Sequence, residues 1–150
     1  MRRTLGLGKL VFLVFTFMAF SAAARADEVL LVKERAVPQY VLEGKGVAAK
    51  MFGRKKDVYM GVLTLQPGAV VPRHHHEKAA EILYFLKGRG IFTIDGKEYK
   101  IGPHMAIYIP PLTDHSFRVT SKNAVVAVQI WTPAGPEVKY LNWKKVEKKR

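Results

Sequence analysis

The sequence predicts an all-β domain, either a sandwich or a barrel. Short runs rich in apolar, β-branched and aromatic residues recur along the chain, and turn residues separate them about every 8–12 positions. The pairs Pro67-Gly68 and Asp95-Gly96 mark two of these turns, and Asp-Gly favours a tight hairpin. Sustained helical periodicity is absent, and only the stretch after Pro136 could hold a helical turn or two. The predicted strands cover residues 29–33, 58–66, 69–76, 81–87, 91–94, 98–101, 106–109, 116–120 and 124–131.

Composition limits the class of protein further. At 150 residues, the chain fits one domain with one core. Hydrophobic residues make up 49% of it, which is typical of a globular protein and not of a disordered one. The lack of cysteine excludes disulfides, thiolate zinc sites, thiol nucleophiles and a cysteine-linked lipid anchor.

Residues 1–26 have the features of an export signal. Arg2, Arg3 and Lys9 give a positive start, residues 10–20 are almost wholly apolar, and small residues lead to a cleavage position near Ala26. An uncleaved anchor is the alternative, but an apolar run of about 11 residues is short for a membrane-spanning helix. We therefore expect a periplasmic or secreted protein with no stable membrane anchor after cleavage. The paired arginines leave the twin-arginine route open beside the general one.

The chain is basic, with a net charge of +13. The excess is scattered except for a cluster at the C-terminal end, made of Lys144, Lys145, Lys148, Lys149 and Arg150. Such an end is either simply solvated or contacts anionic lipid, a wall polymer or an acidic sugar. We do not expect a nucleic-acid partner, since we recognise no nucleic-acid-binding motif. The predicted divisions are a signal peptide (1–26), an N-terminal strand and connecting arm (27–57), a barrel (58–135) and a basic C-terminal tail (136–150).

Histidines and a glutamate lie at a spacing that builds a metal site on a hairpin. Strand side chains alternate between two faces, so His74 and His76 point one way and His75 points the other. After a tight turn, Glu81 can return beside them on the neighbouring strand, and His115 is a fourth candidate ligand. Imidazole suits Fe, Ni, Cu and Zn, and a carboxylate adds an anionic oxygen that suits a harder ion such as Mn.

This motif resembles that of a known family. Gly68, His74, His76, Glu81 and Gly88 match the first motif of the cupin superfamily at every fixed position. The resemblance covers roughly residues 58–132 and implies a double-stranded β-helix, the jelly-roll barrel, with His74, His76, Glu81 and His115 as metal ligands.

The second cupin motif is less well kept. Pro110 and His115 are in place, but His104 and Leu112 stand at positions where cupins usually have glycine, and Val119 replaces an asparagine. Glycine is favoured where φ must be positive, so Leu112 predicts a differently shaped turn before His115.

Strand alternation also indicates which side chains surround the site. Leu83, Phe85 and Phe117 should point inward and Tyr84 outward. Gln129 and Trp131 share one face of the last strand, and both of its faces are apolar enough to be buried. If the Gln129 face is inward, Phe85, Phe117, Gln129 and Trp131 would line a substrate pocket.

Three polar residues near the ligands have less certain roles. Glu77 and Asp114 flank the ligands and are either acceptors for a ligand imidazole N–H or plain loop residues. His104 is expected on a loop, away from the metal.

The ligand set also indicates the kind of metal. Four protein ligands would close a tetrahedral zinc site but would leave about two positions open on an octahedral ion. We therefore expect one divalent metal ion, with Fe, Mn, Ni or Cu preferred over Zn. The open positions could hold water, O2 or a bidentate substrate.

The resemblance leaves several functions open. We favour a metal-dependent dioxygenase or oxidase acting on a small oxygen-rich molecule, because the site keeps exchangeable positions on a redox metal. The alternatives are a metal-assisted isomerase, lyase or decarboxylase, and a non-catalytic module that binds a sugar or acid. The isomerase or lyase needs a positioned general base, and spacing distinguishes none of the candidates Tyr59, Tyr84, Tyr108 and Glu98. A homodimer that exchanges the 29–33 strand would cover a sheet edge.

Overall fold

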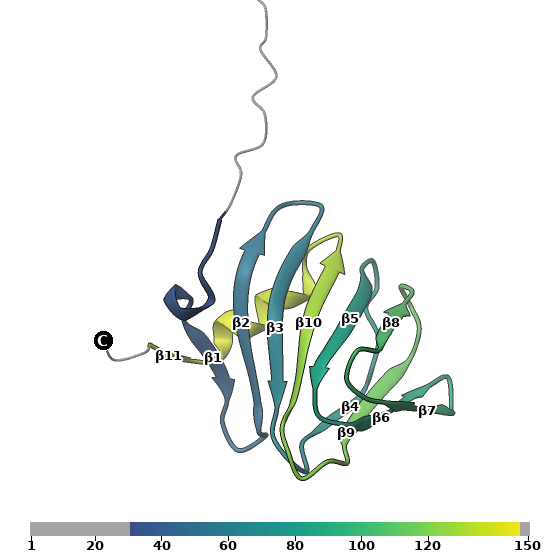
Figure 1. The fold of residues 1–150 in the computed structure, drawn as a ribbon. Coiled ribbons are helices and arrows are strands. Elements are labelled where there is room, and N and C mark those ends of the chain that lie inside the picture. Colours follow the sequence, from purple (N-terminus) through teal and green to yellow (C-terminus); the bar gives the residue numbers. More distant parts are fainter. Residues whose placement is uncertain (1–30, 148–150) are drawn as a thin grey trace, which may run out of the picture.

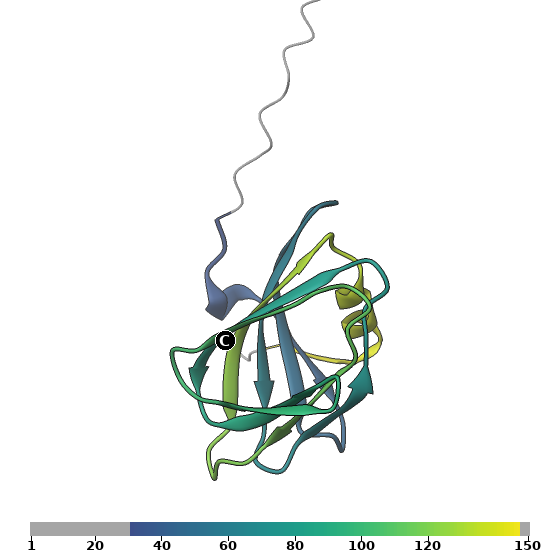
Figure 2. The same cartoon turned by 90° about the vertical axis from the view of Figure 1, so that its right-hand side faces the viewer.

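The described part of the chain forms two facing antiparallel sheets. The computed structural model describes residues 31–147 (Figure 1). The larger sheet has the strand order β11-β1-β2-β3-β10-β5-β8, and the smaller has the order β4-β9-β6-β7. Figure 2 shows the two sheets curving around a common interior, which is the jelly-roll arrangement that the sequence predicts. The predicted signal peptide lies outside the described residues.

The elements follow in chain order. They are η1 (Glu34–Ala36), β1 (Gln39–Leu42), β2 (Val47–Arg54), β3 (Tyr59–Leu65), β4 (Val70–His74), β5 (Ala80–Lys87), β6 (Gly90–Ile94), β7 (Lys97–Ile101), β8 (Ala106–Ile109), β9 (His115–Val119), β10 (Val125–Thr132), η2 (Pro136–Asn142) and β11 (Lys144–Val146). The predicted strands between residues 58 and 131 are confirmed, with ends that differ by one or two residues. The Asp95-Gly96 hairpin is confirmed as well, since both residues have positive φ and Ile94 pairs with Lys97.

The expected strand at residues 29–33 is wrong for its described part. Residues 31–33 are irregular and lead into the short helix η1, and Leu31 is 90% exposed. None of the described residues of this run is buried, so burial does not hold them against the sheet. The prediction of a homodimer that exchanges this strand therefore loses its structural basis.

Strand β10 lies between β3 and β5 in the larger sheet and contributes buried side chains to the interior. Ala127, Gln129 and Trp131 alternate inward and are almost fully buried. Trp131 pairs with Glu81 of β5 on one side and with Tyr59 of β3 on the other. The Tyr59 and Trp131 rings lie 5.2 Å apart between centroids, a packing that adds to their burial.

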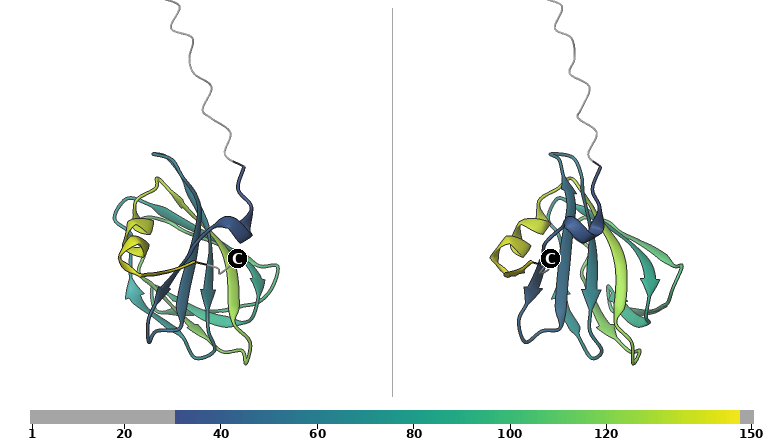
Figure 3. Two further views of the ribbon diagram at one scale, coloured as in Figure 1. Left: turned by 90° about the vertical axis from the view of Figure 1, so that its left-hand side faces the viewer. Right: turned by 60° about the vertical axis from the view of Figure 1, so that its left-hand side comes forward.

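The C-terminal segment is part of the same body. A helical turn does follow Pro136, as the 3-10 helix η2, which lies beside β1 (Figure 3). Tyr140 of η2 is buried against Trp131, and the fully buried Glu137 accepts a hydrogen bond from Arg54 of β2. Strand β11 then pairs with β1. Among the described residues, no helix has the length and apolar character needed to cross a membrane.

The turn before His115 keeps a left-handed residue without glycine. Leu112 has φ +62° and His104 has φ +65°, the conformation in which glycine is favoured. The prediction that Leu112 gives a differently shaped turn is therefore wrong. The Leu112 N–H donates to the carbonyl of His76 at 2.9 Å, so this turn ties two candidate ligand segments together.

We expect glycine at position 112 to stabilise the protein. A left-handed residue with a Cβ carries a steric cost of about 1–2 kcal/mol, which exceeds the entropy that glycine loses on folding. The Leu112 side chain is 64% exposed, so little burial is lost with it. Leu112→Gly should raise the free energy of unfolding by about 0.5–1 kcal/mol over Leu112→Ala, measured by urea denaturation. Equal stability of the two variants would contradict the strain at this turn.

Candidate metal centre

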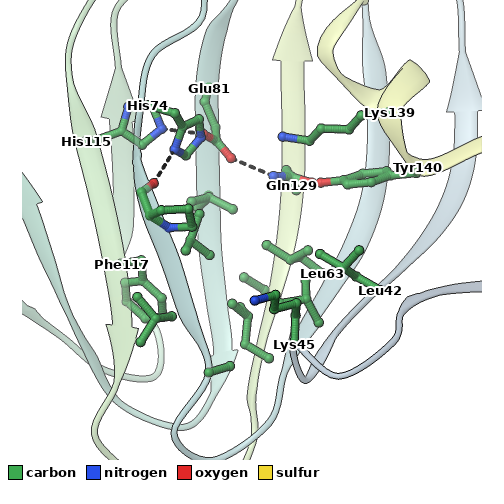
Figure 4. Close-up of a pocket in the computed structure, with 18 of the residues that line it drawn as sticks. Leu42, Lys45, Leu63, His74, Glu81, His115, Phe117, Gln129, Lys139 and Tyr140 are labelled. Carbon is green, nitrogen blue, oxygen red and sulfur yellow. Dashed lines mark hydrogen bonds and ion pairs between the residues drawn. The ribbon is translucent and has the colours of Figure 1, made fainter. Parts of the chain in front are cut away.

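The four predicted ligands converge where the two sheets meet. His74 ends β4, His115 begins β9, and the two are partners in the β4–β9 ladder. Glu81 comes from β5 in the other sheet, and His76 follows β4 in the connecting turn. One donor atom from each residue lies within 4.8 Å of all the others. Figure 4 shows three of the four residues, His74, Glu81 and His115. This group of three imidazoles and one carboxylate could bind a metal ion.

The carboxylate lies at the centre of the group. Glu81 Oε2 is 3.2 Å from His76 Nε2 and 3.2 Å from His115 Nε2. Among the three imidazole rings, those of His74 and His115 are the nearest pair, with centroids 4.3 Å apart against 5.1 and 5.4 Å for the other two pairs. His76, Glu81 and His115 are buried, whereas His74 is half-buried.

Backbone carbonyls fix the orientation of two rings. His74 Nδ1 donates to the carbonyl of Pro72 at 2.9 Å, and His115 Nδ1 donates to the carbonyl of Thr113 at 2.8 Å. In this tautomer the Nε2 atom carries the free lone pair and faces the group. A hydrogen bond of this kind, opposite the ligating nitrogen, is typical of metal-binding histidines.

Two residues outside the ligand set hold the carboxylate. Gln129 Nε2 donates to Glu81 Oε1 at 2.6 Å, and the Tyr140 hydroxyl donates to Gln129 Oε1 at 2.8 Å. The Gln129 face of β10 is therefore the inward one. Sequence reasoning missed Tyr140, because only folding of the C-terminal segment brings it beside β10.

The electrostatics keep the group ready for a cation. Burial opposes ionisation of Glu81, but contacts with His115, His76 and Gln129 outweigh it and hold the pKa of this carboxyl below its usual range. Burial lowers the pKa of His74 to about 4. Burial lowers the pKa of His115, but the hydrogen bond to the Glu81 carboxylate and that to the Thr113 carbonyl raise it, and the net shift is upward.

The residues present fit a metal ion. His115 Nε2 is buried and has no aligned hydrogen-bond partner among the described residues, although it faces Glu81 Oε2. A buried carboxylate and an unbonded imidazole nitrogen are both costly, and a shared divalent cation would satisfy both. The donor set of nitrogen and oxygen atoms suits a first-row transition metal.

The neighbouring polar residues belong to a separate, exposed network. His75 faces away from the group, as predicted, and its ring nitrogens bond Asp114 and Glu77 at 3.1 Å each. Asp114 also pairs with Arg73. Glu77 and Asp114 therefore accept from His75, and the interpretation that they support a ligand imidazole is wrong. His104 lies in a turn, near the Tyr84 hydroxyl.

A cavity of about 780 Å³ opens beside the candidate ligands. His74, Glu81 and His115 form part of its wall, and Phe85, Phe117, Gln129 and Trp131 all line it, as do Leu83 and Phe92. Tyr84 points away from the interior, as strand alternation predicts. Two lysines that sequence reasoning did not single out, Lys45 and Lys139, also line the cavity.

Comparison with known proteins identifies the family. The family model described as cupin domain matches residues 61–131, which contain the ligand motif and β10. The chain belongs to the cupin superfamily. An uncharacterized protein of Methanocaldococcus jannaschii is 37% identical over 65 residues, or 39% of this chain and 52% of that protein. An acireductone dioxygenase of Bacillus pumilus is 33% identical over 64 residues, or 39% of this chain and 36% of that enzyme. The chain thus spans about half, or less, of the curated relatives it matches.

Solved structures share the fold. An RmlC-like cupin from Shewanella frigidimarina aligns with a TM-score of 0.66 and 16% identity, covering 74% of this chain and 96% of that one. The polyketide cyclase RemF from Streptomyces resistomycificus aligns with a TM-score of 0.63 and 18% identity over 73% and 82% of the two chains. A predicted oxalate decarboxylase from Thermotoga maritima aligns with a TM-score of 0.59 and 22% identity over 69% and 99%.

We expect Gln129 to support metal affinity. Gln129→Leu removes the donor that orients Glu81, and loss of such a contact typically weakens metal binding by about 10–100-fold. Competition with a chromophoric chelator would measure the affinity, and Gln66→Leu at an exposed turn is the matched control. An unchanged affinity in a folded Gln129→Leu protein would show that Glu81 is not held for a metal.

Proposed function

We propose that this protein is a metal-dependent dioxygenase or oxidase that acts on a small molecule bearing oxygen donors. The observation that carries the proposal is the position of the donor set, since three of its four residues, His74, Glu81 and His115, line a cavity. Four protein ligands leave about two positions open on an octahedral ion. A substrate in the cavity would therefore lie beside three of the residues that would hold the ion.

The roles of the protein's own residues follow from their contacts. His74, His76, Glu81 and His115 would hold one divalent ion, with Fe, Mn, Ni or Cu preferred over Zn. Such an ion, when bound, supplies exchangeable positions for O2 and for the oxygen atoms of a substrate. Gln129 keeps the Glu81 carboxylate oriented and ionised.

The cavity lining shapes the rest of the substrate. Phe85, Phe92 and Phe117 pack against one another with ring centroids 4.7–6.2 Å apart and keep water from that side of the donor set. A substrate that fills this space needs an apolar body beside its oxygen donors, such as an enol, diol or oxo acid on an aromatic or alkyl frame.

The acireductone dioxygenase of Bacillus pumilus supports the choice of O2 chemistry. Its similarity extends over 64 residues, 39% of this chain, and it covers only 36% of that enzyme. The similarity therefore supports the reaction class and not the substrate.

A metal-assisted isomerase, lyase or decarboxylase is the second candidate, and Lys139 favours it. Such a reaction needs a general base beside the metal. Although Lys139 is exposed as a whole residue, burial of its amine lowers its pKa, and the amine lines the same cavity as the ligands. A solely ligand-binding role, the third alternative, would show saturable binding without turnover.

The proposed setting is outside the cytoplasm. The features of residues 1–26 support export followed by cleavage near Ala26. The mature protein would then meet its small-molecule substrate in the periplasm or the medium, without nucleic acid as a partner. A homodimer remains one arrangement of the mature protein.

Oxygen uptake with a substrate panel tests the reaction class. We expect the iron-, manganese-, nickel- or copper-loaded protein to consume O2 with at least one catechol, flavonol, enediol or dicarboxylate. Glu81→Gln should lower that rate by 100-fold or more, on the order of the loss of one electrostatic contact in an active site. Glu77→Gln, an exposed carboxylate on the same turn, should leave the rate unchanged.

The same panel separates the alternatives. Product formation without O2 uptake would contradict the dioxygenase or oxidase and favour the isomerase or lyase. Saturable binding with no product would leave only the binding module.

A further inference from the structure

We propose that the cavity selects an anionic molecule with an apolar body, and that Lys45 and Lys139 recognise its charged group. This inference rests on the proposed function and names the chemical class of its substrate. The geometry points to it because two lysines that form no ion pair within the described residues line a cavity that is mostly apolar away from the donor set.

The lining of the cavity is mostly hydrocarbon. Away from the donor set it is built from aliphatic and aromatic side chains, including those of Leu42, Leu63, Leu83, Phe92, Phe117 and Trp143. Among the lining residues, Lys45 and Lys139 are the cations, and Glu81 is the single acidic residue. A neutral apolar ligand would leave both cations without a counter-charge, whereas an anionic one would pair with them.

Glu81, the acidic residue of the lining, already has other partners. Glu81 contacts His76, His115 and Gln129, and in the proposed enzyme it also holds the metal. Three neutral imidazoles, one carboxylate and a divalent ion sum to a net positive charge. The two lysines add further positive charge, so the cavity would attract an anion both beside the donor set and near Lys45.

Lys139 lies close to the donor set. Its Nζ is 5.2 Å from the centroid of the Trp131 ring and 5.6 Å from that of Tyr140, so aromatic faces hold the ammonium group in place. In Figure 4 this nitrogen is directed toward the Glu81–Gln129 pair. Within the described residues, no carboxylate forms an ion pair with Lys139.

Lys45 supplies a second cation farther along the cavity. It lies in the turn between β1 and β2, and in Figure 4 it is drawn near Leu42 and Leu63, well away from the candidate ligands. In the described part of the chain it also has no ion-pair partner, although Glu43, two residues away, pairs with Lys144. The charged group of a ligand thus has a binding partner at either end of an apolar space.

Both lysines belong to parts of the chain outside the family match. The cupin domain match covers residues 61–131, whereas Lys45 precedes β3 and Lys139 lies in η2. The ligand motif therefore lies inside the matched region, and the two cations lie outside it. The family match by itself does not imply selection for an anion.

A pair of fluorescent probes tests the inference on metal-free protein. Anilinonaphthalene sulfonate is anionic, and N-phenylnaphthylamine has the same aromatic body without the sulfonate. We expect the anionic probe to bind more tightly, and Lys45→Met and Lys139→Met each to weaken it by about fivefold, the effect of one partly exposed ion pair. The double variant should lose about tenfold or more, and the neutral probe should change by less than about twofold.

Methionine keeps the apolar stem of each lysine, so the cavity shape and the packing on Trp131 are retained. Lys122→Met, which removes one charge from an exposed loop outside the cavity lining, is the matched control and should leave both probes unaffected. Equal loss of the two probes, or an anionic probe that is insensitive to both lysine substitutions, would overturn the inference. Because no metal and no turnover enter this experiment, that result would leave the proposed oxygen chemistry standing, and absent oxygen uptake would leave the anion site standing.

Discussion

The structure depends on the buried carboxylate of Glu81. An ionised group in a protein interior is costly unless charges or hydrogen bonds surround it. Here the compensation comes from both sheets, since β4, its following turn and β9 supply His74, His76 and His115 while β10 supplies Gln129. The two sheets are thus joined at one polar point within an otherwise apolar interior, and a divalent ion would complete its charge balance.

The chemical character of the cavity follows from this arrangement. His74, Glu81 and His115 line the cavity together, and aliphatic and aromatic side chains form most of the rest of its lining. The C-terminal segment closes the polar wall from behind, with Tyr140 bonded to Gln129. The same segment brings Lys139 into the lining. The helix η2 therefore contacts the residue that orients Glu81 and adds one cation to the cavity, and the ligand motif by itself indicates neither contact.

Sequence reasoning reached the features that depend on local spacing. Alternation and the gap between His76 and Glu81 indicated three of the ligands and the orientation of His75, Phe85 and Phe117, whereas His115 was assigned through the resemblance to the cupin motifs. It missed β2 and β11, because alanine, glycine and lysine in these stretches give weak strand signals. It also missed β1, a run of only four residues that pairs with β2 and with the distant β11. The contacts of Tyr140 and Lys139 depend on how η2 packs on the barrel, which no local pattern encodes. The left-handed backbone of Leu112 was hidden because leucine rarely adopts it.

Metal content measured by mass spectrometry tests the central claim most directly. Protein purified from the organism that produces it should carry about one Fe, Mn, Ni or Cu ion per chain, as expected for a donor set with open positions. The ion should be lost from a His76→Ala/His115→Ala variant and retained by His75→Ala, which alters the exposed member of the same histidine run. Absence of metal from the unaltered protein, or equal loss in the His75→Ala control, would contradict the account.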